Sequence, residues 1–258
     1  MRRLKQYRVQ TVLMIAQGKQ DEAVSFHKKV TNSIIYDKNP FNRNYKLKKG
    51  KIVYDFISGK PSFSTTNNLL NIIRENYSVQ AHKEIQKTKE LIVVVTNMNT
   101  REPIYISNKD CTWSEFTFWT WVSTLAYPFS NTVIVDGVEY GDGGFSVSLP
   151  VGYVCKRSKN VRAIVLNEEE ENKPFNNENV VEGLISIIDV VMAVNLKKDI
   201  GYGKHFIENH GVDLEYIFMP NKVAEQPMNF IPSEAEKMIR LGKTCGRFSQ
   251  TIKQNNNV

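Results

Sequence analysis

The spacing of apolar residues in the N-terminal third of the chain predicts helices. Between Val9 and Ile35, apolar positions recur every three or four residues, which is the period of a helix with one buried face. Gly18 interrupts the pattern, so we expect two helices. The polar stretch from Asp37 to Lys51 predicts a loop. After it, Thr65-Thr66-Asn67 offers caps for another helix, which runs to about Tyr77 and is followed by a polar linker.

The middle of the chain changes to a strand pattern. Leu91 to Val95 is a short, unbroken, β-branched run, typical of a strand buried on both faces of a mainly parallel sheet. Ile104 to Ile106 predicts a shorter strand, and the aromatic stretch from Thr112 to Ala126 predicts a helix. Val133 to Tyr140 predicts a hairpin, because its central Asp136-Gly137 suits a turn in which both residues have positive φ.

The C-terminal third alternates strands and helices. Val161 to Leu166 predicts a buried strand, and the acidic, Asn-rich stretch over residues 168–179 predicts a solvated loop. Val180 to Asn195 predicts an apolar helix, Tyr216 to Phe218 a late strand, and Ser233 to Leu241 a helix capped by Ser233. Strands interleaved with helices indicate an α/β protein.

Length and composition favour one domain in the cytoplasm. The 258 residues, 41% of them hydrophobic, are enough for one core, so we expect a single domain over residues 1–258. No apolar run approaches the length of a membrane span, and no signal-like run follows the charged N-terminus. Three scattered cysteines, Cys111, Cys155 and Cys245, lack the spacing of a disulfide framework or a zinc site, and we expect neither a metal nor a cofactor.

The net charge of +7 is compatible with anionic lipid or nucleic acid as a partner, or with a solvated surface alone. The basic residues cluster near the N-terminus and around Lys46 to Lys51 without the interleaved aromatic residues of a platform for single-stranded nucleic acid. We therefore expect no nucleic-acid partner.

An acidic residue among glycines follows the predicted hairpin, in the order Gly141-Asp142-Gly143-Gly144. Glycine lets the backbone bend tightly and approach another group closely. Taken alone, Asp-Gly-Gly is often only a turn.

The surrounding segments give this loop a context. They are a buried strand continuing through Thr96 (Val93 to Pro103), a small-residue segment (Val122 to Phe129), the hairpin with Asp-Gly-Gly (Asp136 to Gly144), a segment with a proline (Ser148 to Val151), and a final strand and helix (Glu215 to Gly242). In this order and at this spacing, the chain resembles most of a patatin-like phospholipase domain.

The resemblance implies a three-layer α/β fold with a mainly parallel central sheet and a lipid acyl hydrolase acting on a lipid or ester at a membrane surface. Such enzymes resemble serine hydrolases that use a Ser–Asp dyad. Asp142 then matches the aspartate that accepts the serine proton, and Gly141, Gly143 and Gly144 shape its loop.

Two parts of the family pattern do not appear in the chain. No G-x-S-x-G elbow occurs, and no glycine run precedes a helix near the start. Thr11 to Lys19 is similar to the helix that follows the elbow, so the resemblance implies an N-terminally incomplete domain that is inactive as this chain alone. Whether the protein is an enzyme stays open. Either a separately encoded segment supplies the serine, or the chain is a non-catalytic lipid-binding or protein-interaction remnant. The isolated chain is expected to self-associate, to be poorly soluble, or to bind such a segment.

Other candidate residues carry weaker signals. Ser25, Ser33, Ser123 and Ser146 lack the flanking glycines of an elbow and are interpreted as structural. Nothing in the sequence places His27, His82, His205 or His210 beside a nucleophile. Ser58-Gly59-Lys60 and Gly201-Tyr202-Gly203 are interpreted as turns, and the tryptophans of the Thr112 to Ala126 helix as core residues rather than a membrane contact.

Overall fold

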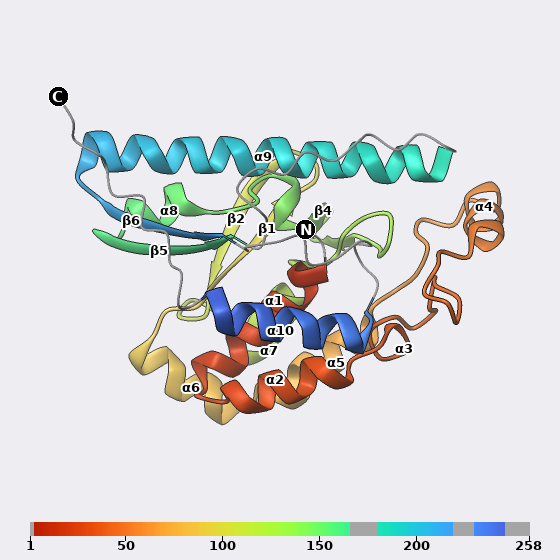
Figure 1. Cartoon of the computed structure of the whole chain (residues 1–258), viewed down its shortest axis with the longest axis horizontal. Helices are drawn as coiled ribbons and strands as arrows, with labels where there is room; N and C mark the ends of the chain where they lie inside the picture. Colours follow the sequence, from red (N-terminus) through yellow and green to blue (C-terminus); the bar gives the residue numbers. More distant parts are fainter. Residues whose placement is uncertain (1–2, 166–179, 219–229, 246–258) are drawn as a thin grey trace. The chain divides into compact units, whose positions relative to one another are not determined.

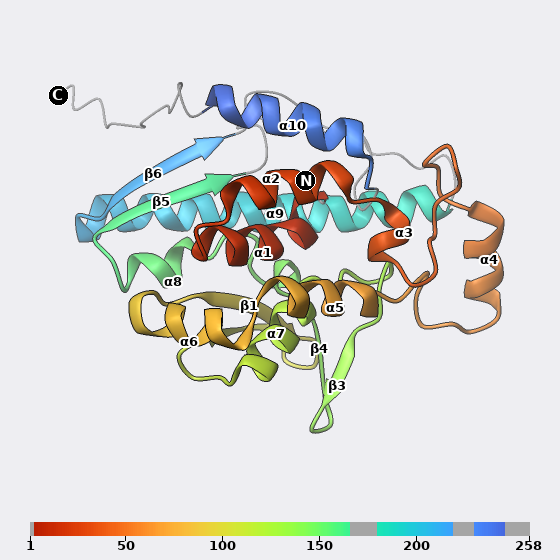
Figure 2. The ribbon, with the colours of Figure 1, turned by 90° about the horizontal axis from the view of Figure 1, so that it is seen from below.

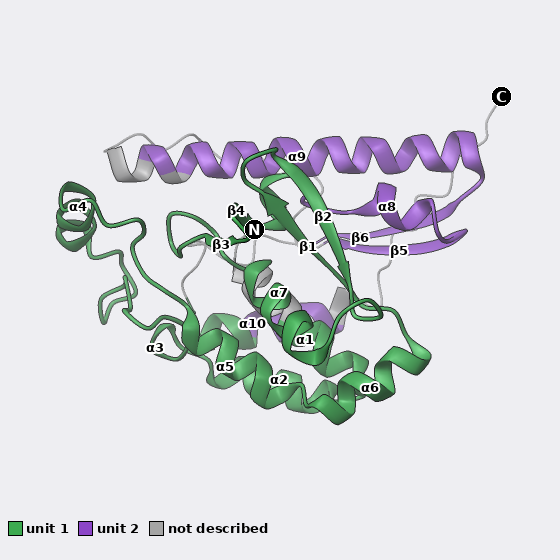
Figure 3. Ribbon diagram, turned by 180° about the vertical axis from the view of Figure 1, so that it is seen from behind, with its two compact units in different colours: residues 1–146, 226–236 green, residues 147–225, 237–258 purple. Residues whose placement is uncertain are grey.

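The computed structural model describes residues 3–165, 180–218 and 230–245 (Figure 1). The chain forms two compact units (Figure 3): unit 1 comprises residues 1–146 and 226–236, and unit 2 comprises residues 147–225 and 237–258. The class is mixed α/β, with a four-stranded antiparallel sheet in unit 1 and a two-stranded parallel sheet in unit 2. The single domain expected over residues 1–258 stays a prediction. The loop predicted over residues 168–179 lies outside the described residues.

Unit 1 begins with three helices, α1 (Arg3–Ala16), α2 (Gln20–Lys29) and the short α3 (Asn32–Ile35). The predicted break at Gly18 is confirmed. Gly18 has a φ of 77°, a value that glycine adopts without steric cost, and this lets the chain turn between α1 and α2.

Two further helices of unit 1, α4 (Lys49–Ile57) and α6 (Val79–Thr88), were not predicted, and for α6 the expected polar linker was wrong. Only two residues of α6, His82 and Ile85, are buried, so its apolar stripe is too thin for a periodic signal. Its start is fixed locally, because the Ser78 side chain accepts a hydrogen bond from the Ala81 N–H at 3.1 Å.

Helix α5 (Asn67–Asn76) is confirmed, but its expected cap is wrong. Thr66 makes no side-chain cap. Instead, the Asp37 carboxylate accepts hydrogen bonds from the backbone N–H groups of Asn67 and Asn68, at 3.1 and 2.9 Å. Asp37, thirty positions earlier in the chain, therefore caps the N-terminus of α5. A pattern of neighbouring residues in the sequence does not reveal a contact over this separation.

The sheet of unit 1 has the strand order β2-β1-β4-β3. The strands are β1 (Ile92–Asn97), β2 (Glu102–Ser107), β3 (Val133–Val135) and β4 (Val138–Asp142). All pairs are antiparallel, so the parallel sheet expected around Leu91 to Val95 is wrong. The reason is the connection: β1 and β2 are joined by a tight turn in which the Arg101 N–H bonds to the Asn97 carbonyl, and so short a link joins only antiparallel neighbours.

The hairpin of β3 and β4 is confirmed. Asp136 and Gly137 have φ values of 50° and 79°, as its turn requires. Beyond β4, the chain forms a single 3₁₀ turn, η1 (Gly143–Phe145).

Helix α7 (Trp113–Val122) packs on this sheet, and α5 packs on α7. The N–H of the buried Trp121 donates to the Thr66 carbonyl at 2.9 Å, and Trp113 donates to the Tyr77 carbonyl. Trp119 lies edge-on to Tyr140 of β4, with 5.1 Å between ring centroids. These contacts place the tryptophans in the packing of unit 1.

Unit 2 contains α8 (Val151–Cys155), β5 (Asn160–Val165), α9 (Val180–His210) and β6 (Asp213–Phe218). Strands β5 and β6 run parallel and side by side (Figure 2), from the pair Asn160 and Asp213 to the pair Val165 and Phe218. Helix α10 (Pro232–Cys245) begins in unit 1 and continues in unit 2, and Ser233 lies inside it rather than at its cap.

Helix α9 continues fifteen residues beyond its predicted end, so the turn expected at Gly201-Tyr202-Gly203 is wrong. Packing explains why glycine is tolerated there. A Cβ on Gly203 would lie 1.9 Å from the Tyr216 hydroxyl of β6, so glycine lets α9 approach the sheet closely. None of the described helices is both long and apolar enough to cross a membrane.

Candidate functional site

Asp142 is the last residue of β4 and lies beside the centre of β1. It pairs with Val95 in the antiparallel register. Its backbone is held from two sides: the N–H donates to the Leu125 carbonyl at 3.0 Å, and the carbonyl accepts from the Thr96 hydroxyl at 2.8 Å. The predicted strand, the segment after α7 and the hairpin therefore all contribute to fixing Asp142.

The Asp142 side chain folds back onto its own loop. Its Oδ1 accepts a hydrogen bond from the Gly144 N–H at 2.7 Å, which caps η1, and the residue is only 5% exposed. A carboxylate that accepts a backbone N–H makes a charge-assisted bond, stronger than one between neutral groups. This bond fixes the carboxylate orientation within unit 1.

The glycines of the loop are buried, and one of them has a steric reason to be glycine. A Cβ on Gly143 would lie 2.2 Å from the Val94 carbonyl oxygen and 2.6 Å from the carbonyl carbon, so no side chain fits. A Cβ on Gly141 would meet only ordinary contacts, the nearest at 3.4 Å. Gly143 thus lets the turn after Asp142 lie directly on β1.

Three of the four candidate serines bond through their hydroxyls to neighbouring groups. Ser146 is the nearest in sequence, and its Oγ bonds to the Thr96 hydroxyl at 2.9 Å and to the Gly143 carbonyl at 3.2 Å. Ser123 donates to the Thr120 carbonyl at 2.6 Å, and Ser33 bonds to the Thr31 hydroxyl at 2.9 Å. Ser25 is exposed on α2. The contacts of Ser33, Ser123 and Ser146 agree with the structural role predicted for them, and the role of Ser25 stays a prediction.

The histidines of unit 1 are packing residues. His82 is buried between the Tyr77 hydroxyl and the Cys111 carbonyl, at 3.1 Å from each. The Thr11 hydroxyl bonds to Nε2 of His27 at 2.5 Å, and burial lowers the pKa of His27 to about 4, which keeps it neutral at pH 7. Among the described residues, no three His, Cys, Asp or Glu side chains gather as a metal site would require.

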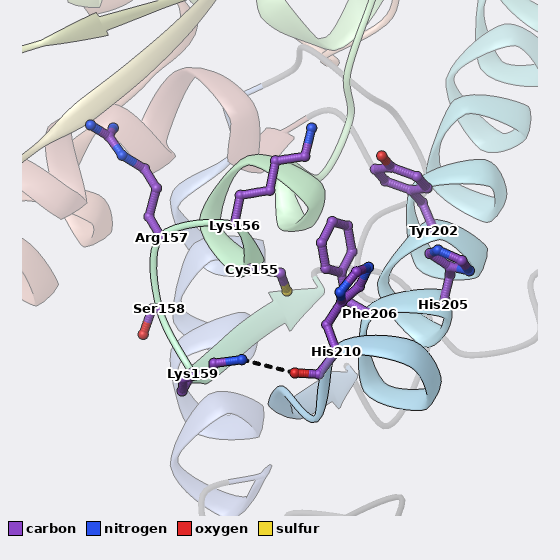
Figure 4. Close-up of a pocket in the computed structure, with 9 residues that line it drawn as sticks. All are labelled: Cys155, Lys156, Arg157, Ser158, Lys159, Tyr202, His205, Phe206 and His210. Carbon is purple, nitrogen blue, oxygen red and sulfur yellow. Dashed lines mark hydrogen bonds between the residues drawn. The ribbon is translucent and has the colours of Figure 1, made fainter.

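Unit 2 contains a pocket of about 480 Å³ that the sequence patterns did not single out (Figure 4). It lies between the segment after α8 and the C-terminal half of α9. Its lining residues are Cys155, Lys156, Arg157, Ser158, Lys159, Tyr202, His205, Phe206 and His210. The basic run from Lys156 to Lys159 is visible in the sequence as a possible anion-binding segment. The two histidines, His205 and His210, reach this segment only because α9 extends to His210.

The sequence matches no known protein-family model and no curated protein. In unit 1, Asp142 provides a buried carboxylate that the Gly144 N–H orients, and a carboxylate can accept a proton from a suitably placed hydroxyl.

Proposed function

We propose that the protein is a lipid acyl hydrolase of the patatin-like type, in which Asp142 is the general base of a Ser–Asp dyad. The proposal includes the three-layer fold of that family and a cytoplasmic protein that meets its substrate at a membrane surface. The serine would come from outside the described residues, on a separately encoded segment.

The observation that carries this proposal is how the Asp142 carboxylate is held. The side chain is buried, one oxygen is fixed by the Gly144 N–H, and the loop lies on β1 because Gly143 has no side chain. Catalytic groups must be held within a narrow range of orientation, and rigid strands hold them better than long loops. An ordinary surface turn needs no such support.

In the proposed reaction, the serine hydroxyl attacks the ester carbonyl while its proton passes to the Asp142 carboxylate. Collapse of the tetrahedral intermediate expels the alcohol, which takes up that proton, and leaves an acyl-serine. Water then hydrolyses the acyl-serine with the same carboxylate as base.

The second candidate is a non-catalytic lipid-binding or interaction protein that keeps the loop for its stability. The contacts of the serines favour it: Ser33, Ser123 and Ser146 bond to neighbours in their own local structure. On this account, the Gly144 cap is the whole role of Asp142.

Labelling with a fluorophosphonate separates the two candidates, because this reagent reacts with an activated serine on whichever polypeptide carries it. The tagged chain is isolated with its bound partners from its own source and labelled, and the modified peptide is identified by mass spectrometry. We expect a labelled serine whose labelling falls sharply in Asp142→Asn. The matched control is Asp136→Asn in the exposed turn of the same hairpin, where Asn tolerates the positive φ. No labelled serine, or equal labelling of both variants, would overturn the hydrolase proposal.

A further inference from the structure

The pocket of unit 2 has a strongly basic lining. Three of its nine residues are Lys or Arg, two are His, and none is Asp or Glu. Cys155 lies at its buried side, and burial raises the pKa of its thiol, so it is a neutral group there. A pocket with several cationic donors and no carboxylate favours an anionic ligand.

The donors differ in how they are held. The Lys159 ammonium donates to the His210 carbonyl at 2.9 Å, which fixes it at the C-terminal end of α9 (Figure 4). The Arg157 guanidinium stacks over the Tyr153 ring at 4.8 Å and points away from the other lining side chains. The Lys156 ammonium points away from Lys159 and His210 (Figure 4), so the two lysines supply positive charge at two different parts of the pocket. Phosphate suits such a set, because its oxygens accept several hydrogen bonds at once.

The same helix carries an apolar stripe ahead of the pocket. Five exposed residues of α9 define this stripe: Leu184, Ile187, Val190, Val191 and Val194. Their exposed fractions run from 44% to 58%. The spacing of three and four residues places them on one face, and the buried Met192 and Leu196 lie on the opposite face. Isolated exposed apolar residues are ordinary, but a continuous stripe indicates a contact surface.

Positive charge continues the stripe toward the pocket. Lys197, Lys198 and Lys204 are exposed on α9, and the helix then supplies Tyr202 and His205 to the pocket. From residue 184 to residue 205, no Asp or Glu is among the α9 residues that the structure describes as exposed. An apolar stripe followed by lysines is the composition of a helix that lies in the interface of an anionic membrane.

We propose that unit 2 docks on the surface of an anionic phospholipid membrane through the α9 stripe, and that its basic pocket receives a headgroup phosphate. The stripe favours a lipid as the source of the phosphate, because a membrane would cover these apolar side chains and a soluble phosphate ester would leave them exposed to water. A second copy of the chain fits this surface less well, because its own α9 lysines would repel the lysines beside the stripe. This docking does not depend on ester hydrolysis, so it can be tested independently of the role of Asp142.

Vesicle flotation with the full chain tests the docking. The probes are vesicles of phosphatidylcholine alone and of phosphatidylcholine mixed with phosphatidylglycerol. We expect binding to the mixed vesicles only. The pocket variant Lys156→Gln/Lys159→Gln and the stripe variant Ile187→Asn/Val194→Asn should each weaken binding about tenfold. Lys87→Gln, which removes one charge from the exposed face of α6 in unit 1, should bind almost as the parent does, and so should Asp142→Asn.

Circular dichroism first shows that each variant is folded. Equal binding to both vesicle types would overturn the proposal, and so would unchanged binding of either double variant. Inorganic phosphate that binds the chain in solution, with no vesicle binding, would assign the pocket to a soluble ester instead. A dimer that the stripe variant dissociates would assign the stripe to a second copy.

Discussion

At the scale of single residues, the Asp142 side chain supplies both a hydrogen-bond acceptor and a negative charge. Two substitutions separate the contributions of the acceptor and of the charge to stability. Asp142→Ala removes the acceptor for the Gly144 N–H and should lower the free energy of unfolding by about 1–3 kcal/mol. Asp142→Asn keeps an oxygen acceptor and should cost clearly less. Urea unfolding of both variants measures the difference. An Asn variant as unstable as the Ala variant would show that the negative charge itself stabilises the loop.

Gly143 offers a steric test of the same loop. Gly143→Ala would place a Cβ 2.2 Å from the Val94 carbonyl oxygen, and the shift it forces should destabilise the protein by about 1–3 kcal/mol. The control is Gly50→Ala at an exposed position of α4, where a Cβ meets no atom within 4 Å. That change should stabilise the protein by about 0.5–1 kcal/mol. Thermal melts that shift in the same direction for both variants would contradict the packing of Gly143 on β1.

Residue patterns predicted the Asp142 loop because its signals are local: a turn of Asp-Gly, a strand, and glycines at fixed offsets. They missed the cap that Asp37 gives to α5 and the pairing of Lys159 with the end of α9, because both join distant parts of the chain. The role of Asp142 stays a prediction.

At the scale of elements, α7 has the best-defined start. The Thr112 hydroxyl accepts a hydrogen bond from the Glu115 N–H at 3.3 Å, and the Glu115 carboxylate accepts from the Thr112 N–H and hydroxyl at 2.8 and 2.7 Å. These two bonds to the carboxylate lower the pKa of Glu115 below its usual 4.5. A carboxyl group with a lowered pKa stabilises the fold at any pH above its unfolded-state pKa. This stabilisation is lost as the pH falls through its folded-state pKa.

Thr112→Ala should therefore destabilise the protein by about 0.5–2 kcal/mol at pH 7 and reduce the loss of stability on acidification below pH 4.5. Urea unfolding at pH 7 and in the acidic range gives both quantities. Thr88→Ala, at the C-terminal end of α6, is the matched control and should leave the stability at pH 7 and the acid profile nearly unchanged. If Thr112→Ala loses stability on acidification just as the parent does, the capping box is not the source of the low pKa.

Helices and strands with strong local signals were predicted, but the elements that pair or pack with them in space were not. Hydrophobic content alone indicated a strand at Leu91 to Val95, but the tight turn to β2 decides that its partner is antiparallel. Likewise, Gly201 and Gly203 predict a turn by local preference, but α9 continues through both, and at Gly203 it packs closely on Tyr216 of β6.

At the scale of the whole molecule, the parallel sheet is the feature that predicts association. Among the described strands, β5 and β6 pair only with each other, and Ile164 of β5 is 59% exposed. A strand edge that no other strand covers is a template for further pairing. We predict that the isolated chain self-associates or is poorly soluble, measured by sedimentation and by a dye for exposed apolar surface.

A co-expressed segment with a Gly-rich loop and a G-x-S-x-G elbow should reduce both signals. The variant Ile187→Asn/Val194→Asn should still self-associate, because the sheet edges and not the α9 stripe are responsible. A monodisperse, dye-silent monomer that melts cooperatively would show that the sheet is complete as it stands.

The most direct test of the central claim is the rate of ester hydrolysis in the presence of the serine-bearing polypeptide. The purified chain alone should show no turnover of a short-chain ester. With the partner, Asp142→Asn should lower the rate by about 100-fold or more, and Asp136→Asn should leave it nearly unchanged. Equal rates for the two variants would contradict a catalytic Asp142. Turnover by the chain alone that is abolished by Ser25→Ala, Ser33→Ala, Ser123→Ala or Ser146→Ala would contradict a serine from elsewhere.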